Sequence, residues 1–169
     1  MRQVVLQIHT TGLDPLINRV CAIAMIELVN HMRTGNTIAQ TLDPLQKLEP
    51  GAAEENGLTN EKLVGQPLFL NIADQVLGFC EQAEVIAHNM PFVESFVDQE
   101  LKLMGYEPLS NHCYPKCLIG MQRTQHPDHR RGLNDMRKHY GIPDNIYSGK
   151  SAMARANLTT HIYQVLTGS

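Results

Sequence analysis

The chain has 169 residues, of which 43% are hydrophobic and 18% charged, and its formal net charge is −3. This length supports one domain with a buried core and is short for two. The balanced charge excludes a strongly basic nucleic-acid coat, and the absence of roughly 20 consecutive apolar residues excludes a membrane span. The four cysteines are too few for a disulfide framework, so we expect a soluble protein of the reducing cytoplasm.

The first third of the chain predicts three strands. Residues 4–6 are β-branched and apolar, residues 20–29 form a continuous apolar run, and residues 37–42 alternate between apolar and polar types. A continuous run is typical of a strand in the middle of a sheet, and alternation is typical of a strand with one exposed face. Residues 32–36 contain Thr-Gly-Asn, so we predict a turn there and an antiparallel hairpin.

The rest of the chain predicts mainly helices, because apolar residues recur at helical spacing. Pro67 is expected in the first turn of the first of them, and Gly105 at the end of the second. We expect helices over residues 68–80, 92–103, 118–124, 133–140 and 151–166, a short buried strand at 84–88, and a polar, basic loop at 126–132. Strands followed by helices around further strands predict an α/β domain with one mixed sheet.

Short motifs in a fixed order along nearly the whole chain resemble one known family. They are Val4-Val5-Leu6 with Thr10-Thr11-Gly12, Thr34-Gly35-Asn36, Val85-Ile86-Ala87-His88-Asn89, Tyr140-Gly141-Ile142 and Leu166-Thr167-Gly168. This set resembles the proofreading 3′–5′ exonuclease (epsilon) family of bacterial DNA polymerase III, within the DEDD exonuclease superfamily. The resemblance implies a ribonuclease-H-like exonuclease fold, with a central mixed five-stranded sheet and flanking helices, as one domain over residues 1–169. It also implies that the family's flexible carboxy-terminal tail is absent, because the sequence stops at Ser169.

The resemblance also locates the family's catalytic positions. The family holds two divalent metal ions with four carboxylates, hydrolyses phosphodiester bonds, and uses a histidine as general base. The corresponding positions of this chain hold Gln7, His9, Val93, Lys150 and Arg155. Because Mg²⁺ and Mn²⁺ prefer oxygen ligands, an amide, an aliphatic side chain and two cations do not build a two-metal centre. We therefore predict that the catalytic residues are lost and that no metal cofactor is bound.

Neighbouring carboxylates are poor substitutes for the lost ones. Glu94 follows Val93 by one position, which turns a helical side chain by about 100°. Asp98 lies a turn further along, and Asp14 belongs to the turn after the first strand. Residual metal-dependent 3′–5′ exonuclease activity, carried by Glu94 or Asp98, stays open as an alternative.

Four cations are candidates for an anion site that would take a phosphate or a nucleotide. Lys150 and Arg155 lie near the start of the last predicted helix, and we expect both to face the cleft if the fold is kept. Arg130 and Arg131 lie in the 126–132 loop. Pairing with nearby carboxylates, or solvation, is the competing interpretation of these cations.

Cys113, Cys117, His126 and His129 form a C-x3-C…H-x2-H pattern that suggests zinc. Cys117 and His126 flank an expected helix, however, and a rise of about 1.5 Å per residue separates them by ~13 Å. Zinc–ligand bonds of about 2.0–2.3 Å would require that helix to break. We therefore expect no metal at these four residues.

These observations predict a pseudoenzyme, an exonuclease-like domain without its metal centre that acts as a protein-interaction or scaffold module in a larger complex. The alternative is a non-cleaving binder of single-stranded nucleic acid or nucleotides, through Lys150, Arg155 and the basic loop. Nucleic acid is the weaker partner prediction, because aromatic residues make up only 5% of the chain and there is no Trp to stack on bases.

Overall fold

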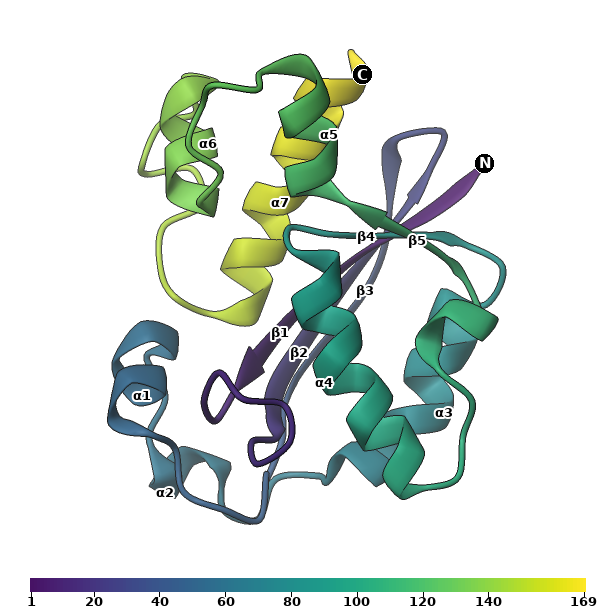
Figure 1. The fold of residues 1–169 in the computed structure, drawn as a ribbon, viewed down its shortest axis with the longest axis vertical. Helices are drawn as coiled ribbons and strands as arrows, with labels where there is room; N and C mark the ends of the chain where they lie inside the picture. Colours follow the sequence, from purple (N-terminus) through teal and green to yellow (C-terminus); the bar gives the residue numbers. More distant parts are fainter.

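The computed structural model describes residues 1–169 and contains one five-stranded mixed sheet with helices on both faces (Figure 1). Its strands are β1 (Arg2–Thr10), β2 (Val20–Val29), β3 (Met32–Thr41), β4 (Glu84–Ala87) and β5 (Tyr114–Cys117). Their order across the sheet is β3-β2-β1-β4-β5, so the first strand is central. β2 is antiparallel to both of its neighbours, whereas β4 is parallel to both of its own, which confirms the predicted mixed sheet.

Seven α-helices and one 3-10 turn (Leu109–Asn111) accompany the sheet. The helices are α1 (Pro50–Asn56), α2 (Asn60–Leu63), α3 (Phe69–Cys80), α4 (Met90–Leu103), α5 (Leu118–Gln125), α6 (Leu133–His139) and α7 (Ala152–Thr167). α3 and α4 cover one face of the sheet, and α5, α6 and α7 cover the other (Figure 1). None of them combines the length and the apolar character that crossing a membrane requires.

The alternation of side chains along β1 divides the core into two layers. Val4, Leu6 and Ile8 pack with α3 and α4, while Val5 packs with α7 on the opposite face. Burying such a side chain fully contributes about 1.5–3 kcal/mol, so both layers hold the central strand in place. Because successive strand residues point to opposite faces, Gln7 and His9 share the α7 face with Val5.

The β2–β3 hairpin differs from the prediction. Its turn is Asn30-His31, with φ of 49° and 68°, and β3 already begins at Met32. Two-residue hairpin turns favour two residues of positive φ, a conformation that asparagine tolerates well. Gly35, with φ of 94°, lies where the pairing with β2 shifts register. The Thr-Gly-Asn segment is therefore a bulge inside a strand and not the turn.

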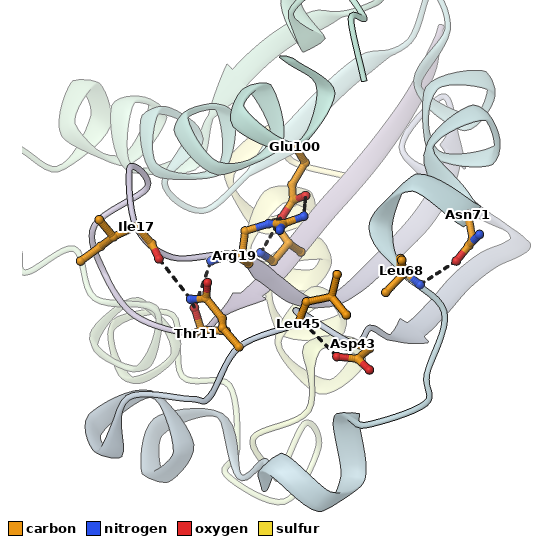
Figure 2. Close-up of polar contacts among 10 residues, drawn as sticks. Thr11, Ile17, Arg19, Asp43, Leu45, Leu68, Asn71 and Glu100 are labelled. Atoms are coloured by element: carbon orange, nitrogen blue, oxygen red, sulfur yellow. Dashed lines mark hydrogen bonds and ion pairs between the residues drawn. The ribbon is translucent and has the colours of Figure 1, made fainter. Parts of the chain in front are cut away.

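The start of α3 also differs from the prediction. Pro67 lies before the helix, which begins at Phe69. The backbone N–H of Leu68 donates to the side chain of Asn71 at 2.8 Å, and this contact caps the amino terminus of the helix (Figure 2). By contrast, α4 ends at Leu103, and Gly105 follows it with a φ of 74°, as its position predicted.

Candidate functional site

A cavity of about 560 Å³ lies at one edge of the sheet, where the parallel strands β1 and β4 both end. Ligand sites of α/β proteins commonly lie beyond the carboxyl ends of their parallel strands. The cavity is lined from the end of β1 and the turn after it, the β4–α4 junction, α1 and α7. These segments are far apart in sequence, and the sheet is what brings them together.

Four of the five positions that the family resemblance located lie around this cavity: Gln7, His9, Val93 and Arg155. The side-chain amide of Gln7 folds back and donates to the carbonyl of Ile8 at 3.0 Å. Val93 is 5% exposed and presents an aliphatic side chain from the first turn of α4. None of the four side chains offers a carboxylate to the cavity.

Two histidines of the cavity are bound to distant backbone carbonyls. His9 donates from Nε2 to the carbonyl of Lys150, and His88 donates from Nε2 to the carbonyl of Arg131, both at 2.7 Å. A carbonyl only accepts hydrogen bonds, so both rings carry a proton on Nε2. Burial lowers the pKa of both imidazoles, and the positive charge of Arg155 lowers it further. Both rings are therefore neutral at pH 7 and tie distant segments to the sheet.

The two cations near the start of α7 hold the end of α1. Lys150 donates from Nζ to the carbonyl of Glu54 at 2.7 Å. The guanidinium of Arg155 donates to the carbonyl of Glu55 at 2.7 Å and to its carboxylate at 2.9 Å. Cations stabilise the last carbonyls of a helix, where the negative end of its dipole lies. Arg155 lines the cavity, but Lys150 does not, because its ammonium group is bound at α1.

The carboxylates that line the cavity are Glu49 and Glu55, which the sequence analysis did not single out. Glu55 is paired with Arg155, and Glu49 accepts a hydrogen bond from the amide of Asn18 at 3.1 Å. A Cβ at Gly12 would lie 2.4 Å from the Glu49 side chain, so a larger residue there would require the ends of the Glu49 and Asn18 side chains to move. α1 has seven residues, too few to show a periodic pattern, and its sequence signals are a proline at its start and Gly57 just after its end.

The carboxylates considered as substitutes lie outside the cavity. Asp98 accepts a hydrogen bond from the N–H of Leu109 at 2.8 Å, and Asp14 accepts one from the N–H of Leu16 at 2.9 Å. Burial raises the pKa of Glu94, and the nearby charge of Asp98 raises it further. Asp98 and Asp14 therefore accept hydrogen bonds from nearby backbone, and none of the three carboxylates lines the cavity.

Buried polar contacts hold the turn after β1, which forms one wall of the cavity (Figure 2). Arg19 makes two parallel bonds of 2.9 and 2.7 Å to the carboxylate of Glu100, which is 3% exposed. Thr11 donates to the side chain of Asn18 at 2.9 Å and accepts from Gln46 at 2.8 Å. Bidentate pairs of this kind fix geometry as well as adding stability, so this wall is rigid.

The four cations proposed as an anion site do not converge. Arg131 donates to the carbonyl of Pro127 within its own loop, and neither it nor Arg130 lines the cavity. Lys150 is bound to α1, which leaves Arg155 as the one cation of the four at the cavity. The four candidate cations therefore lie in separate places, and only Arg155 is at the cavity.

The residues of the C-x3-C…H-x2-H pattern do not come together either. α5 runs unbroken between Cys117 and His126 and keeps them apart. The thiols of Cys113 and Cys117 each donate to a backbone carbonyl, and burial raises the pKa of Cys113 to about 11. His126 and His129 group instead with His139, a residue that the pattern did not include.

The fold agrees with comparisons to known proteins. The chain matches the exonuclease (RNase_T) family over residues 4–146 and belongs to this family. It is 27% identical to DNA polymerase III subunit epsilon of Pasteurella multocida, over 99% of this chain and 68% of that protein. It is 28% identical to the Escherichia coli subunit, over 99% of this chain and 72% of that protein.

Among solved structures, the chain is similar to exonuclease I. One structure of that protein superposes with a TM-score of 0.87 at 16% identity, over 99% of this chain and 41% of exonuclease I. The E. coli enzyme in complex with a dT13 oligonucleotide gives a TM-score of 0.85 at 16% identity, over 98% of this chain and 41% of that one. The structural likeness to exonuclease I confirms the predicted ribonuclease-H-like exonuclease fold. The family match and the sequence identity to the two subunits confirm the resemblance to the epsilon family.

Proposed function

We propose that this exonuclease-family domain does not hydrolyse nucleic acid and acts as a protein-interaction module in a larger complex. The donor set of the cavity carries the proposal. A two-metal centre needs several carboxylate oxygens, and hard divalent ions take oxygen ligands almost exclusively. Around this cavity, the family's positions hold an amide, an imidazole, an aliphatic side chain and a guanidinium. This set does not fit two divalent metal ions.

The two carboxylates that are present do not repair the donor set. Glu55 is neutralised by Arg155, whose positive charge also repels a divalent cation at the same place. Glu49 accepts a hydrogen bond from Asn18 and belongs to the wall of the β1–β2 turn. Lys150 and Arg155 use their charge to hold α1 against α7, which is a structural role.

An exposed apolar patch beside the cavity supports a protein partner. Leu13, Leu16 and Ile17, here called the turn patch, are 81%, 78% and 67% exposed in the turn after β1. Clustered apolar side chains on a rigid turn are typical of interaction surfaces. The relatives are subunits of DNA polymerase III, so we propose that the partner belongs to a replication assembly in the cytoplasm.

An exonuclease assay tests the loss of catalysis. Single-stranded DNA with a labelled 5′ end is incubated with the purified chain and Mg²⁺ or Mn²⁺, and we expect no shortening above a protein-free control. Matched variants Glu49→Gln and Glu55→Gln remove the carboxylates that line the cavity. Metal-dependent shortening that disappears in either variant, or in Glu94→Gln or Asp98→Asn, would contradict the proposal.

Size-exclusion chromatography with the host's purified DNA polymerase III tests the interaction. We expect the chain to co-elute, and the variant Leu16→Glu/Ile17→Glu to lose at least about tenfold in affinity because it places charges in the turn patch. Val64→Glu is the matched control, since Val64 is 72% exposed in a separate loop. The partner assignment fails if the chain never co-elutes, or if both variants lose affinity equally.

Arg155 at the cavity favours a second candidate function, the binding of single-stranded nucleic acid without cleavage. The structural likeness to exonuclease I in complex with dT13 is consistent with it. The pairing of Arg155 with Glu55 opposes it, so we expect no change in fluorescence anisotropy when labelled dT13 is titrated. Binding that weakens with salt and is lost in Arg155→Ala would favour this second function.

A further inference from the structure

Three histidines, two from the loop between α5 and α6 and one from the end of α6, meet on the surface. His126 directly follows α5, His129 lies in the loop, and His139 is the last residue of α6. One ring nitrogen of each histidine can serve as a metal ligand, and these three atoms lie within 4.8 Å of one another. The ring centroids of His129 and His139 are 4.0 Å apart, and those of His126 and His139 are 4.8 Å apart. We call these residues the histidine cluster.

The backbone around the histidine cluster is held in place on both sides. The N–H of His126 donates to the carbonyl of Gln122 and ends α5, and the N–H of His129 donates to the carbonyl of His126 at 3.4 Å. The carbonyl of Arg131 accepts the 2.7 Å bond from His88, which ties the same loop to the sheet. The three histidines therefore stand close together before any ligand arrives.

The three imidazoles have free coordinating atoms. None of them makes a side-chain hydrogen bond to another protein group, in contrast to His9 and His88. His129 and His139 are exposed and His126 is half-buried, so an ion from solvent can reach all three. A neutral imidazole offers one nitrogen lone pair, which makes three ligand atoms available at one place.

The chemistry of the ligands selects the class of metal. Imidazole nitrogen suits zinc and similar borderline divalent transition metals, whereas Mg²⁺ and Ca²⁺ require oxygen. Tetrahedral bonds of about 2.0–2.1 Å place ligand nitrogens roughly 3.3 Å apart, so rotation of exposed side chains closes the remaining gap. Arg130 in the same loop opposes a cation and Asp128 favours one, and water screens both charges.

We propose that His126, His129 and His139 bind one zinc ion, with solvent in the fourth position. Three protein ligands and an open position are a common coordination of zinc. The ion would cross-link the 126–132 loop to the end of α6. This site is independent of the cavity and of the function proposed for it, and it uses only the histidines of the C-x3-C…H-x2-H pattern.

Isothermal titration of the untagged full chain with zinc tests the proposal, because a polyhistidine tag would itself bind the metal. We expect one equivalent of zinc per chain, and a loss of at least about tenfold in affinity in each of His126→Ala, His129→Ala and His139→Ala. His161→Ala is the matched control, since its ring lies against the hydroxyl of Tyr147 outside the cluster, and we expect its affinity to be unchanged.

Two further measurements separate zinc at the cluster from weak binding elsewhere. Cobalt substituted for zinc should give the visible absorption of a nitrogen-ligated site, and the triple alanine variant should lack that absorption. Zinc should also raise the unfolding midpoint of the wild-type chain and leave that of the triple variant unchanged. The proposal is overturned if no zinc binds up to about 1 mM, or if all three variants bind it as the control does.

Discussion

The histidines of the cavity and those of the histidine cluster have the same side chain but differ in their hydrogen bonding and their burial. His9 and His88 each donate one ring N–H to a carbonyl from a distant part of the chain, and burial keeps them neutral. The three histidines of the cluster make no such bond, and two of them are exposed while His126 is half-buried. His9 and His88 stabilise the fold through these bonds, whereas the ring nitrogens of the histidine cluster are available to a ligand. Among these five histidines, burial together with a hydrogen bond to a distant carbonyl distinguishes the structural role from the binding role.

Replacing His9 should have the largest effect on stability. His9→Ala leaves the carbonyl of Lys150 without its donor and opens a void beside α7, so we expect a loss of about 2–3 kcal/mol in the free energy of unfolding. Urea denaturation measures this loss. His129→Ala is the surface control and should change the free energy by less than about 0.5 kcal/mol. Equal losses in the two variants would remove the distinction between the groups.

The pH dependence of stability should come next in size. In the folded chain, the pKa values of His9 and His88 lie below the ordinary value of 6.5. Below pH 6.5 these two histidines bind protons more readily in the unfolded chain than in the folded chain. The free energy of unfolding therefore decreases as the pH falls from 6.5 toward the folded-state pKa values. Urea denaturation between about pH 7.5 and 5.5 should show this decline, and the variant His9→Gln/His88→Gln should show a shallower one. An unchanged decline would mean that other groups cause it.

Removing the cations that hold α1 should have a smaller effect. Lys150→Ala/Arg155→Ala removes the bonds to Glu54 and Glu55 but keeps the carbonyl that accepts from His9. Because these contacts are largely exposed, we expect a loss of only about 0.5–1 kcal/mol. Hydrogen exchange should nevertheless speed up in residues 50–56 and remain unchanged in β1. Unchanged exchange in α1 would show that these cations do not hold the helix.

The smallest expected effect links the two groups of histidines. His88→Ala removes the bond to the carbonyl of Arg131 and so loosens the loop that carries His126 and His129. Zinc affinity should fall by about two- to fivefold, the size of a modest coupling between contacting elements. A loss as large as that of His129→Ala would mean that the loop depends on His88 for its whole shape.

The sequence predicted four of the five strands, the long helices and the carboxy-terminal end of α4, because their signals are local and periodic. The short elements α1, α2 and β5 lacked such signals, since a four-residue strand such as Tyr114–Cys117 is defined by its pairing with β4. Motif order also located Gln7, Val93 and Arg155, which the fold brings to one cavity. The residues that these and neighbouring side chains contact in the folded chain could not be predicted from motif order. Nothing in the sequence indicated that Lys150 binds α1, or that His139 joins His126 and His129.

The contacts across the cavity also have a consequence for synthesis of the chain. The bonds from Lys150 to Glu54 and from Arg155 to Glu55 span 96 and 100 residues, and that from His9 to Lys150 spans 141. Bringing such distant segments together costs chain entropy before the contacts form. The amino-terminal part of the chain leaves the ribosome first, so β1, β2 and β3 can pair early. The wall of the cavity that α7 provides cannot form until α7 has left the ribosome. The cavity is therefore among the last parts of the molecule to take shape.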